Sequence, residues 1–209
     1  MEEALTIHVP DGPTLEARLG PVANPSGGFV VCHPHPLYGG DMDNPVVIRV
    51  AEVAQAAGYA TLRFNFRGAG ASEGVHDKGL GEQEDVRAVM AALASHLPAG
   101  SRVGVMGYSF GAAMAARATR PSLPEVPLGL IAPPLGMYEL DFLQTSPGTL
   151  LLVAGTADSY CPVETLHRLA AITSAEERIV EGADHFFFGK LYPLGEAIGA
   201  WLAGLAPAG

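Results

Sequence analysis

Short apolar runs alternate with longer segments of helical periodicity along most of the chain. The N-terminal segment differs, because two β-prone runs, Leu5–Val9 and Thr14–Leu19, flank the turn-forming sequence Pro-Asp-Gly-Pro and predict a β-hairpin. Six further runs predict strands, and the first five are apolar on both faces, as central strands covered on both sides are. These six runs are Phe29–Cys32, Tyr59–Phe64, Val103–Met106, Leu128–Ala132, Leu150–Ala154 and Glu177–Val180.

Segments of helical periodicity lie between or after these runs, at Pro45–Ala57, Glu82–Leu97, Phe110–Thr119, Val163–Ile172 and Leu191–Leu205. In the clearest of them, Glu82–Leu97, apolar residues recur every three or four positions, and acidic residues crowd the first turn, where the helix dipole favours anions. Alternating strands and helices are typical of βαβ units around a mostly parallel sheet. We therefore expect an α/β fold in a single domain over residues 1–209, with an eight-stranded sheet and helices on both faces.

The composition of the 209 residues narrows the classes of partner. Hydrophobic residues make up 48% and charged residues 16%, which excludes an intrinsically disordered chain. Because the formal net charge is −10, neither a nucleic acid nor an anionic membrane surface is an expected partner. The acidic start lacks the features of a signal peptide, no apolar stretch is long enough to span a membrane, and the two cysteines suit a reducing compartment. We expect a cytoplasmic protein, and the sequence carries no signal for its oligomeric state.

The strongest chemical signal is the sequence Gly-Tyr-Ser-Phe-Gly at residues 107–111. An apolar strand runs directly into it, and a small-residue helix runs directly out of it, which is the context that a nucleophile elbow requires. Such a turn lifts the serine hydroxyl above the sheet at the start of a helix. Ser109 is therefore the candidate nucleophile.

A serine nucleophile needs a base, and the base needs an acid that orients it. In this arrangement the acid and then the histidine follow the serine along the chain, in loops after later strands. Asp158 follows the run Leu150–Ala154, and His185 follows the run that ends at Val180, so these two residues are the candidate acid and base. Asp184 and Asp141 are alternatives for the acid.

The loop His-Pro-His-Pro-Leu-Tyr-Gly-Gly, residues 33–40, follows the third predicted strand. A loop at this place supplies half of an oxyanion hole, and the residue after the nucleophile, Phe110, supplies the other backbone N–H. Proline has no N–H, so His35 or Leu37 must be the loop's donor, and position favours His35. The alternative is a metal site at His33 and His35, with Asp41 and Asp43 near them. No further pattern of ligand residues completes such a site, so we expect neither a metal nor a cofactor.

Other residues are given weaker interpretations. An apolar acyl pocket is expected from Tyr38, Pro133, Leu135 and Phe186, with further candidates at Met42, Pro134, Met137 and Phe142. His76, His96 and His167 are expected at the surface, and Arg63–Gly74 is expected to be a structural turn beside the site rather than a phosphate-binding loop. Residues 133–148 separate the sixth strand from the seventh, which leaves room for about one short helix and no cap domain.

Taken together, these motifs resemble the α/β-hydrolase superfamily. They are G-Y-S-F-G after a strand, the loop H-P-H-P-x-x-G-G, and the sequences R-F-N-F-R-G-x-G-x-S-E-G, G-x-x-D and A-D-H-F-F-x-G-K. The chain is most similar to a compact bacterial subgroup of lidless serine hydrolases related to the dienelactone hydrolase group. That resemblance implies an eight-stranded sheet and a triad of Ser109, Asp158 and His185. Dienelactone hydrolases use a cysteine nucleophile, and Ser109 at this position argues against dienelactone hydrolysis.

The expected function is that of a serine carboxylesterase. It would cleave small to medium carboxylic esters, with a small-molecule ester as its partner, through an acyl-enzyme intermediate. A thioesterase or a small amidase is the alternative on the same triad. A metal-dependent hydrolase and a non-catalytic binding protein are weaker alternatives.

Overall fold

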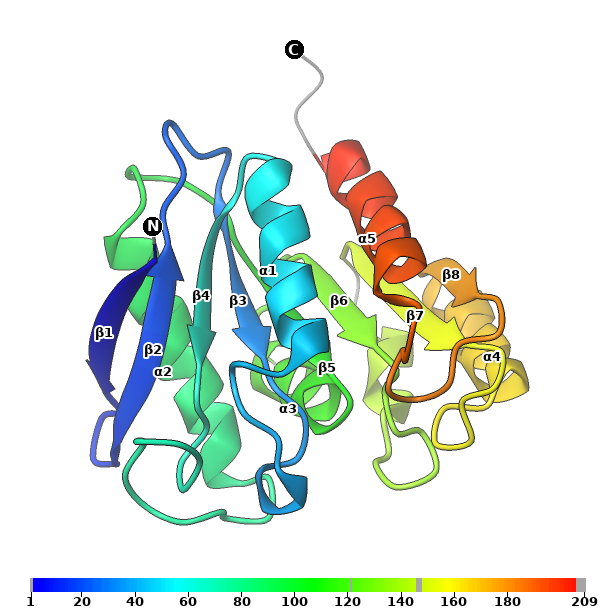
Figure 1. The fold of residues 1–209 in the computed structure, drawn as a ribbon, viewed down its shortest axis with the longest axis horizontal. Helices are drawn as coiled ribbons and strands as arrows, with labels where there is room; N and C mark the ends of the chain where they lie inside the picture. The colour runs from blue at the N-terminus through cyan, green and yellow to red at the C-terminus, as the bar shows by residue number, and fades with distance from the viewer. Residues whose placement is uncertain (1, 121, 146–147, 206–209) are drawn as a thin grey trace.

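The computed structural model of the chain describes residues 2–120, 122–145 and 148–205. Within these ranges eight strands form one sheet in the order β1-β2-β4-β3-β5-β6-β7-β8 (Figure 1). The strands are β1 Glu3–His8, β2 Thr14–Gly20, β3 Gly28–Cys32, β4 Ala60–Phe64, β5 Val103–Tyr108, β6 Leu128–Ile131, β7 Leu150–Gly155 and β8 Glu176–Val180. β2 pairs antiparallel with β1 and with β4, and every other neighbouring pair is parallel. The predicted eight-stranded, mostly parallel sheet is confirmed.

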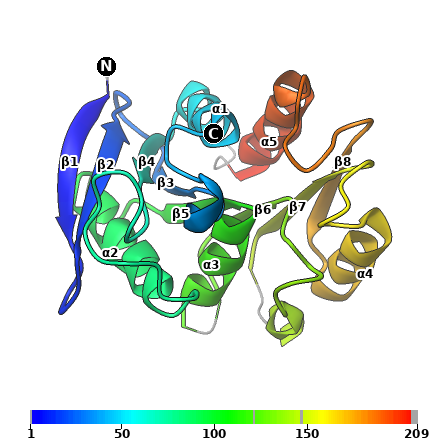
Figure 2. The same cartoon turned by 60° about the horizontal axis from the view of Figure 1, so that its bottom comes forward.

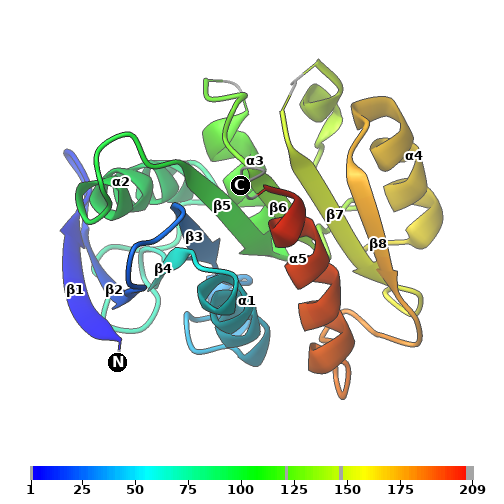
Figure 3. The same ribbon diagram turned by 90° about the horizontal axis from the view of Figure 1, so that it is seen from above.

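Helices cover both faces of this sheet, as predicted. α1 and α5 lie on one face, and α2, α3 and α4 lie on the other (Figures 2 and 3). Their bounds are α1 Pro45–Ala56, α2 Gly81–Ser95, α3 Phe110–Thr119, α4 Val163–Thr173 and α5 Leu191–Leu205, and two 3-10 helices lie at η1 Pro36–Tyr38 and η2 Asp141–Thr145. No helix in the described ranges has the length and apolar character needed to cross a bilayer.

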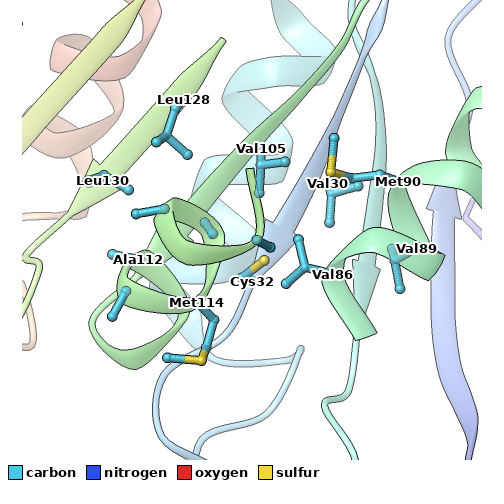
Figure 4. Packing of buried hydrophobic residues seen from close by; sticks show 14 of the residues in the cluster. Val30, Cys32, Val86, Val89, Met90, Val105, Ala112, Met114, Leu128 and Leu130 are labelled. Atoms are coloured by element: carbon cyan, nitrogen blue, oxygen red, sulfur yellow. The ribbon is translucent and has the colours of Figure 1, made fainter. Parts of the chain in front are cut away.

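Each face of the sheet has its own hydrophobic cluster. Every residue of β3, β4, β6 and β7 is buried, as expected for central strands covered on both sides. The expectation of two apolar faces is wrong for β4, whose buried residues include Thr61 and Arg63. Figure 4 shows the cluster beneath α2 and α3, where Val30 and Cys32 of β3 and Val105 of β5 lie beside Val86 and Ala112. The alanines of α3 let this helix lie close to the sheet, which positions the turn that precedes it.

The parallel strands end at one edge of the sheet, and the loops that follow β3, β5 and β7 leave from that edge (Figure 1). Between β6 and β7, the 3-10 helix η2 is the one helical element among the described residues. This segment is too short for a cap domain, so the edge is open, as the sequence predicts.

Candidate active site

Ser109 occupies a strained turn between β5 and α3. Its φ is 54° and its ψ is −118°, a conformation that a non-glycine residue adopts at a cost of about 1–3 kcal/mol. The glycines on either side allow the turn to form. A Cβ on Gly107 would overlap the carbonyl oxygen of Gly111, and a Cβ on Gly111 would overlap that of Cys32. The Gly-x-Ser-x-Gly spacing is therefore explained by close approach of backbone to backbone.

Three of the predicted site residues form one line of hydrogen bonds. The Oγ of Ser109 lies 2.9 Å from Nε2 of His185, and Nδ1 of His185 lies 2.8 Å from Oδ2 of Asp158. Asp158 lies in the loop after β7 and His185 in the loop after β8, so three separate connections meet at one edge of the sheet. This arrangement has the geometry that lets an imidazole accept a proton from a serine hydroxyl.

Asp158 is held so that one oxygen is left for the imidazole. Its Oδ1 accepts hydrogen bonds from the backbone N–H groups of Tyr160, at 2.8 Å, and Cys161, at 3.0 Å. The aspartate and His185 are both buried, with 5% and 8% of their surface exposed. A carboxylate that accepts from Nδ1–H leaves Nε2 with its lone pair toward Ser109, and that is the tautomer a general base needs.

The two alternatives for the acid differ from Asp158 in their surroundings. Oδ1 of Asp184 accepts from the backbone N–H groups of Phe186 and Phe188, at 3.1 and 3.2 Å, and so caps the turn that carries His185. The backbone of Asp141 lies in η2, and its side chain is outside the described part of the structure.

His33, one of the two candidate metal ligands, has both ring nitrogens occupied. Nδ1 lies 2.6 Å from the carbonyl oxygen of Pro34 and donates to it, while Nε2 accepts from the backbone N–H of Phe66 at 2.9 Å. Burial lowers the pKa of His33 to about 4, so the ring is neutral and has no free lone pair for a metal. Among the described residues, no group of three or more His, Cys, Asp or Glu side chains is arranged to hold a metal ion.

His35 and Phe110, the predicted oxyanion donors, lie beside Ser109. Their rings are 4.8 Å apart, and both residues line the same cavity as Ser109 and His185. Within the described ranges neither backbone N–H has a protein acceptor. The N–H of Leu37, the alternative donor, already donates a hydrogen bond to Nδ1 of His35 at 3.2 Å. A developing oxyanion requires two such free N–H groups, so the role of His35 and Phe110 as its donors stays a prediction.

The cavity at Ser109 has a volume of about 420 Å³. Of the predicted pocket residues, Tyr38 and Phe186 line it, whereas Pro133 is buried and Leu135 packs against the core. The lining residues come from the end of β5, the start of α3 and the segments that follow β3, β6, β7 and β8. They are Pro34, His35, Tyr38, Gly39, Gly40, Asn44, Tyr108, Ser109, Phe110, Pro134, Met137, Tyr138, Tyr160, His185 and Phe186.

Comparison with known proteins decides the family. Residues 30–141 match the family model described as X-Pro dipeptidyl-peptidase (S15 family). The chain is 33% identical over 205 residues to the uncharacterized protein RP471 of Rickettsia prowazekii, covering 92% of this chain and 85% of that protein. The chain is an α/β-hydrolase of the S15 family. Two solved structures agree with its membership of the α/β-hydrolases.

The first structure similar to this α/β-hydrolase is an alpha-beta serine hydrolase homologue from Coxiella burnetii. It has 33% identity, a TM-score of 0.86, and coverage of 95% of this chain and 96% of that one. The second is XC6422 from Xanthomonas campestris, a serine hydrolase without a lid, with 31% identity, a TM-score of 0.88 and coverage of 100% and 96%. The predicted membership of the superfamily is confirmed, and the kinship with dienelactone hydrolases stays a prediction.

The expectation that His76 lies at the surface of this α/β-hydrolase is wrong. The His76 side chain is 11% exposed, and its Nδ1 lies 2.7 Å from Oε1 of Glu82, a carboxylate that is fully buried. The ring packs against His35 and Phe110. Glu82 is one of the acidic residues in the first turn of α2, and helical periodicity alone does not show that the preceding loop folds over its side chain.

Tyr108 is a second residue that sequence reasoning missed. Its hydroxyl donates to the carbonyl oxygen of His185 at 2.9 Å, and burial raises the pKa of this phenol well above its usual range. The bond ties the residue before Ser109 to the backbone of His185. The only signal for it is a hydrogen-bonding side chain at the second position of the Gly-x-Ser-x-Gly motif.

The segment Arg63–Gly74 was expected to be a structural turn beside the site, and its first residues contact the loop that carries His35. Arg63 is buried and donates to the carboxylates of Glu2 and Asp43 and to the carbonyl of Met42. Oδ1 of Asn65 accepts from the Met42 N–H at 2.8 Å. Because these donors are used within the protein, the turn has a structural role in this α/β-hydrolase.

Proposed function

We propose that this α/β-hydrolase cleaves small to medium carboxylic esters by nucleophilic catalysis. In this proposal Ser109 is the nucleophile, His185 is the general base and then the general acid, and Asp158 orients the imidazole. The observation that carries it is the continuous line of hydrogen bonds from Ser109 through His185 to Asp158, with lengths of 2.9 and 2.8 Å.

In the acylation step, Oγ of Ser109 attacks the ester carbonyl carbon while its proton moves to Nε2 of His185. Asp158 stabilises the imidazolium that forms, and the two N–H groups of His35 and Phe110 donate to the carbonyl oxygen as it gains negative charge. When the tetrahedral intermediate collapses, the proton on Nε2 passes to the departing alkoxide. The products of this step are a neutral alcohol and an acyl group on Ser109.

In the deacylation step, water takes the place of the alcohol. Nε2 of His185 accepts a proton from the water as its oxygen attacks the acyl carbon, and it returns that proton to Oγ of Ser109. The open edge of the sheet supports this step, since water and alcohol can exchange with no cap to move. The carboxylic acid then leaves, and the free enzyme is restored.

The description of the matched family suggests a second candidate, release of Xaa-Pro dipeptides from a peptide. That activity depends on a free N-terminal ammonium group, which binds where a carboxylate faces it. None of the described residues that line the cavity is an aspartate or a glutamate. The lining therefore favours an ester over a peptide N-terminus, and thioester hydrolysis is the alternative reaction on the same residues.

Steady-state hydrolysis of p-nitrophenyl butyrate tests the proposal. Wild-type protein should turn over the ester, and Ser109→Ala should lower kcat by roughly 10⁴-fold or more, since no acyl-enzyme can form. Ser122→Ala is the matched control, because Ser122 is an exposed serine in the turn after the far end of α3. Near-wild-type turnover by a folded Ser109→Ala protein would contradict the assignment of the nucleophile.

A further inference from the structure

The side chains around the cavity are mostly aromatic and uncharged. Tyr38, Phe110, Tyr138, Tyr160 and Phe186 all line it, and they come from the start of α3 and the segments that follow β3, β6, β7 and β8. Within the described residues of this lining there is no Asp, Glu, Lys or Arg. A cavity that gathers rings from five separate segments is suited to an apolar group with flat faces.

Several of these side chains are unusually open to solvent. Tyr38 is 83% exposed, Phe186 66%, Met137 62% and Tyr160 48%. Single exposed apolar side chains are common, but four of them around one reactive serine form a local apolar surface that a ligand would cover. Covering it removes apolar area from water, which favours binding of an apolar acyl group.

The exposed rings are held beside the reacting atoms. The ring of His185 lies 4.8 Å from Tyr160 and 5.6 Å from Phe186, and the ring of His35 lies 4.8 Å from Tyr38. Rings therefore flank Ser109 both on the side of the base and on the side of the predicted oxyanion loop. An aromatic ring carried a few atoms from the ester carbonyl would meet them in edge or face contact.

We infer that the acyl group taken by this site is uncharged and carries an aromatic ring near the ester carbonyl. This inference rests on the proposed ester hydrolysis and names its substrate class. A carboxylate or ammonium on the acyl chain would lose its hydration in a cavity with no charged side chain to pair it. The volume of about 420 Å³ is near the lower end for small-molecule sites, so it suits a phenylalkanoyl group better than a long acyl chain.

A matched pair of substrates isolates the aromatic contribution: the p-nitrophenyl esters of 3-phenylpropanoic and 3-cyclohexylpropanoic acid. Two methylene groups insulate the ring from the carbonyl, so the intrinsic reactivities match. The cyclohexyl ring is the more hydrophobic, so area burial alone favours it. Contacts between aromatic rings should reverse that order and raise kcat/KM for the phenyl ester about 2- to 12-fold.

Variants at two neighbouring phenylalanines locate the preference. Phe186→Leu should lower the phenyl-to-cyclohexyl ratio toward 1, because Phe186 lines the cavity. Phe188→Leu should leave the ratio unchanged, because Phe188 is 87% exposed and is not among the lining residues. The charge preference is tested with the hexanoate and the hemiadipate, which have the same chain length and differ by one carboxylate.

The outcomes separate this inference from the proposed function. A phenyl-to-cyclohexyl ratio of 1 or below, or hemiadipate turned over as fast as hexanoate, would overturn the inference while ester hydrolysis stands. A ratio above 1 that Phe186→Leu and Phe188→Leu change equally would also overturn the assigned site. Failure of every ester, including p-nitrophenyl butyrate, would overturn the proposed function itself.

A second inference rests on a different observation, the contact of His76 with both predicted oxyanion donors. Its ring lies 4.7 Å from the ring of His35 and 5.6 Å from that of Phe110. Oε1 of Glu82 lies 2.7 Å from Nδ1 of His76, and the two carboxylate oxygens of Glu82 accept the backbone N–H groups of Asp77 and Gly79 at 2.8 Å. The histidine is thus clamped between a fully buried carboxylate and the two residues beside Ser109.

We propose that His76 is a positioning residue that aligns the N–H groups of His35 and Phe110 for the transition state. The role depends on the proposed acyl transfer and on no titration of His76 itself. Misalignment of oxyanion donors weakens binding of the tetrahedral state more than binding of the substrate. Loss of the ring should therefore lower kcat and leave KM nearly unchanged.

Kinetics of His76→Ala test this role. We expect kcat to fall about ten- to a hundredfold, with KM changed less than about twofold. The inhibition constant of phenylboronic acid, which forms a tetrahedral adduct with a serine, should rise by a similar factor. His76→Phe restores a ring without the contact to Glu82 and should recover part of kcat.

The matched control is His167→Ala. His167 makes a similar contact with Glu177, at 2.6 Å, but on α4 and away from the cavity. It should leave kcat and boronic acid inhibition unchanged. A His76→Ala protein that loses only thermal stability, or only affinity for substrate, would overturn the positioning role, and so would an equal kinetic effect of His167→Ala.

Discussion

Lowering the pH from about 7 to about 4 should destabilise the fold through the buried side chain of His33. This imidazole is 0% exposed, donates to the Pro34 carbonyl and accepts from the Phe66 N–H. A protonated ring has no lone pair left for Phe66 and has to be charged without solvent. Protonation therefore breaks the link between the loop that carries His35 and the turn after β4.

The magnitude follows from the pKa. The ordinary value of 6.5 applies to the unfolded chain, and burial lowers the pKa of His33 in the folded chain to about 4. Between these two values the unfolded chain binds the proton first, so the stabilisation is complete above about pH 6.5 and is lost as the pH falls toward 4. At about 1.4 kcal/mol for each tenfold difference in proton affinity, the loss amounts to about 3 kcal/mol.

The assay is urea unfolding of the wild type and of His33→Gln at several pH values. Trp201, the single tryptophan, is 2% exposed and provides the fluorescence signal. Glutamine does not titrate, so the free energy of unfolding of the wild type relative to His33→Gln should fall by about 3 kcal/mol between about pH 7 and pH 4. His96→Gln, at an exposed histidine, is the control, and its free energy of unfolding should fall between pH 7 and pH 4 by the same amount as that of the wild type. A difference between wild type and His33→Gln that stays constant to within about 0.5 kcal/mol would refute the reasoning.

Three further predictions concern the site. Gly107→Ala should lower the free energy of unfolding by about 1–3 kcal/mol and remove most of the activity, because the new Cβ overlaps the Gly111 carbonyl. Wild-type stability in that variant, measured by urea unfolding, would contradict the account of the turn. His185→Gln should lower kcat for ester hydrolysis strongly, since an amide cannot accept the serine proton, and near-wild-type turnover by that folded variant would count against His185 as the base. Short, soluble esters should be turned over better than long-chain lipids, with no jump in rate when the substrate forms micelles. Strong interfacial activation on emulsions would mean that a neighbouring loop closes over the site.

Much of the fold was predictable because its pattern is local. Continuous apolar runs identify the strands that are buried on both faces, and periodicity identifies the helices. The end of α2 shows the limit: the apolar stripe continues to Leu97, but the helix ends at Ser95. Leu97 precedes Pro98, and the residue before a proline disfavours helical geometry.

The site residues that directly follow a strand were predictable from chain order, and those whose position depends on the packing of irregular loops were not. Ser109, Asp158 and His185 each follow a strand end, and parallel strands bring such ends to one edge of the sheet. The segment after β6 has no regular period, so its sequence does not show which side chains face the cavity. Pro134 and Met137 line it, whereas the predicted Leu135 packs against the core.

Contacts between distant loops leave no local pattern at all. The ring of His76 packs against His35 and Phe110, and the bond from Tyr108 to the His185 carbonyl also joins residues far apart in the sequence. Sequence spacing carries no information about either contact, because both arise only when the strand order is set.

The central claim, that Ser109 is an activated nucleophile, is tested most directly by labelling with a fluorophosphonate. This probe reacts with a serine hydroxyl whose proton a neighbouring base accepts. We predict one adduct per folded chain, on the peptide that contains Ser109, and none on Ser109→Ala or on urea-unfolded wild type. A folded wild-type protein that stays unlabelled, or that carries the adduct on another residue and is labelled equally after Ser109→Ala, would contradict the account.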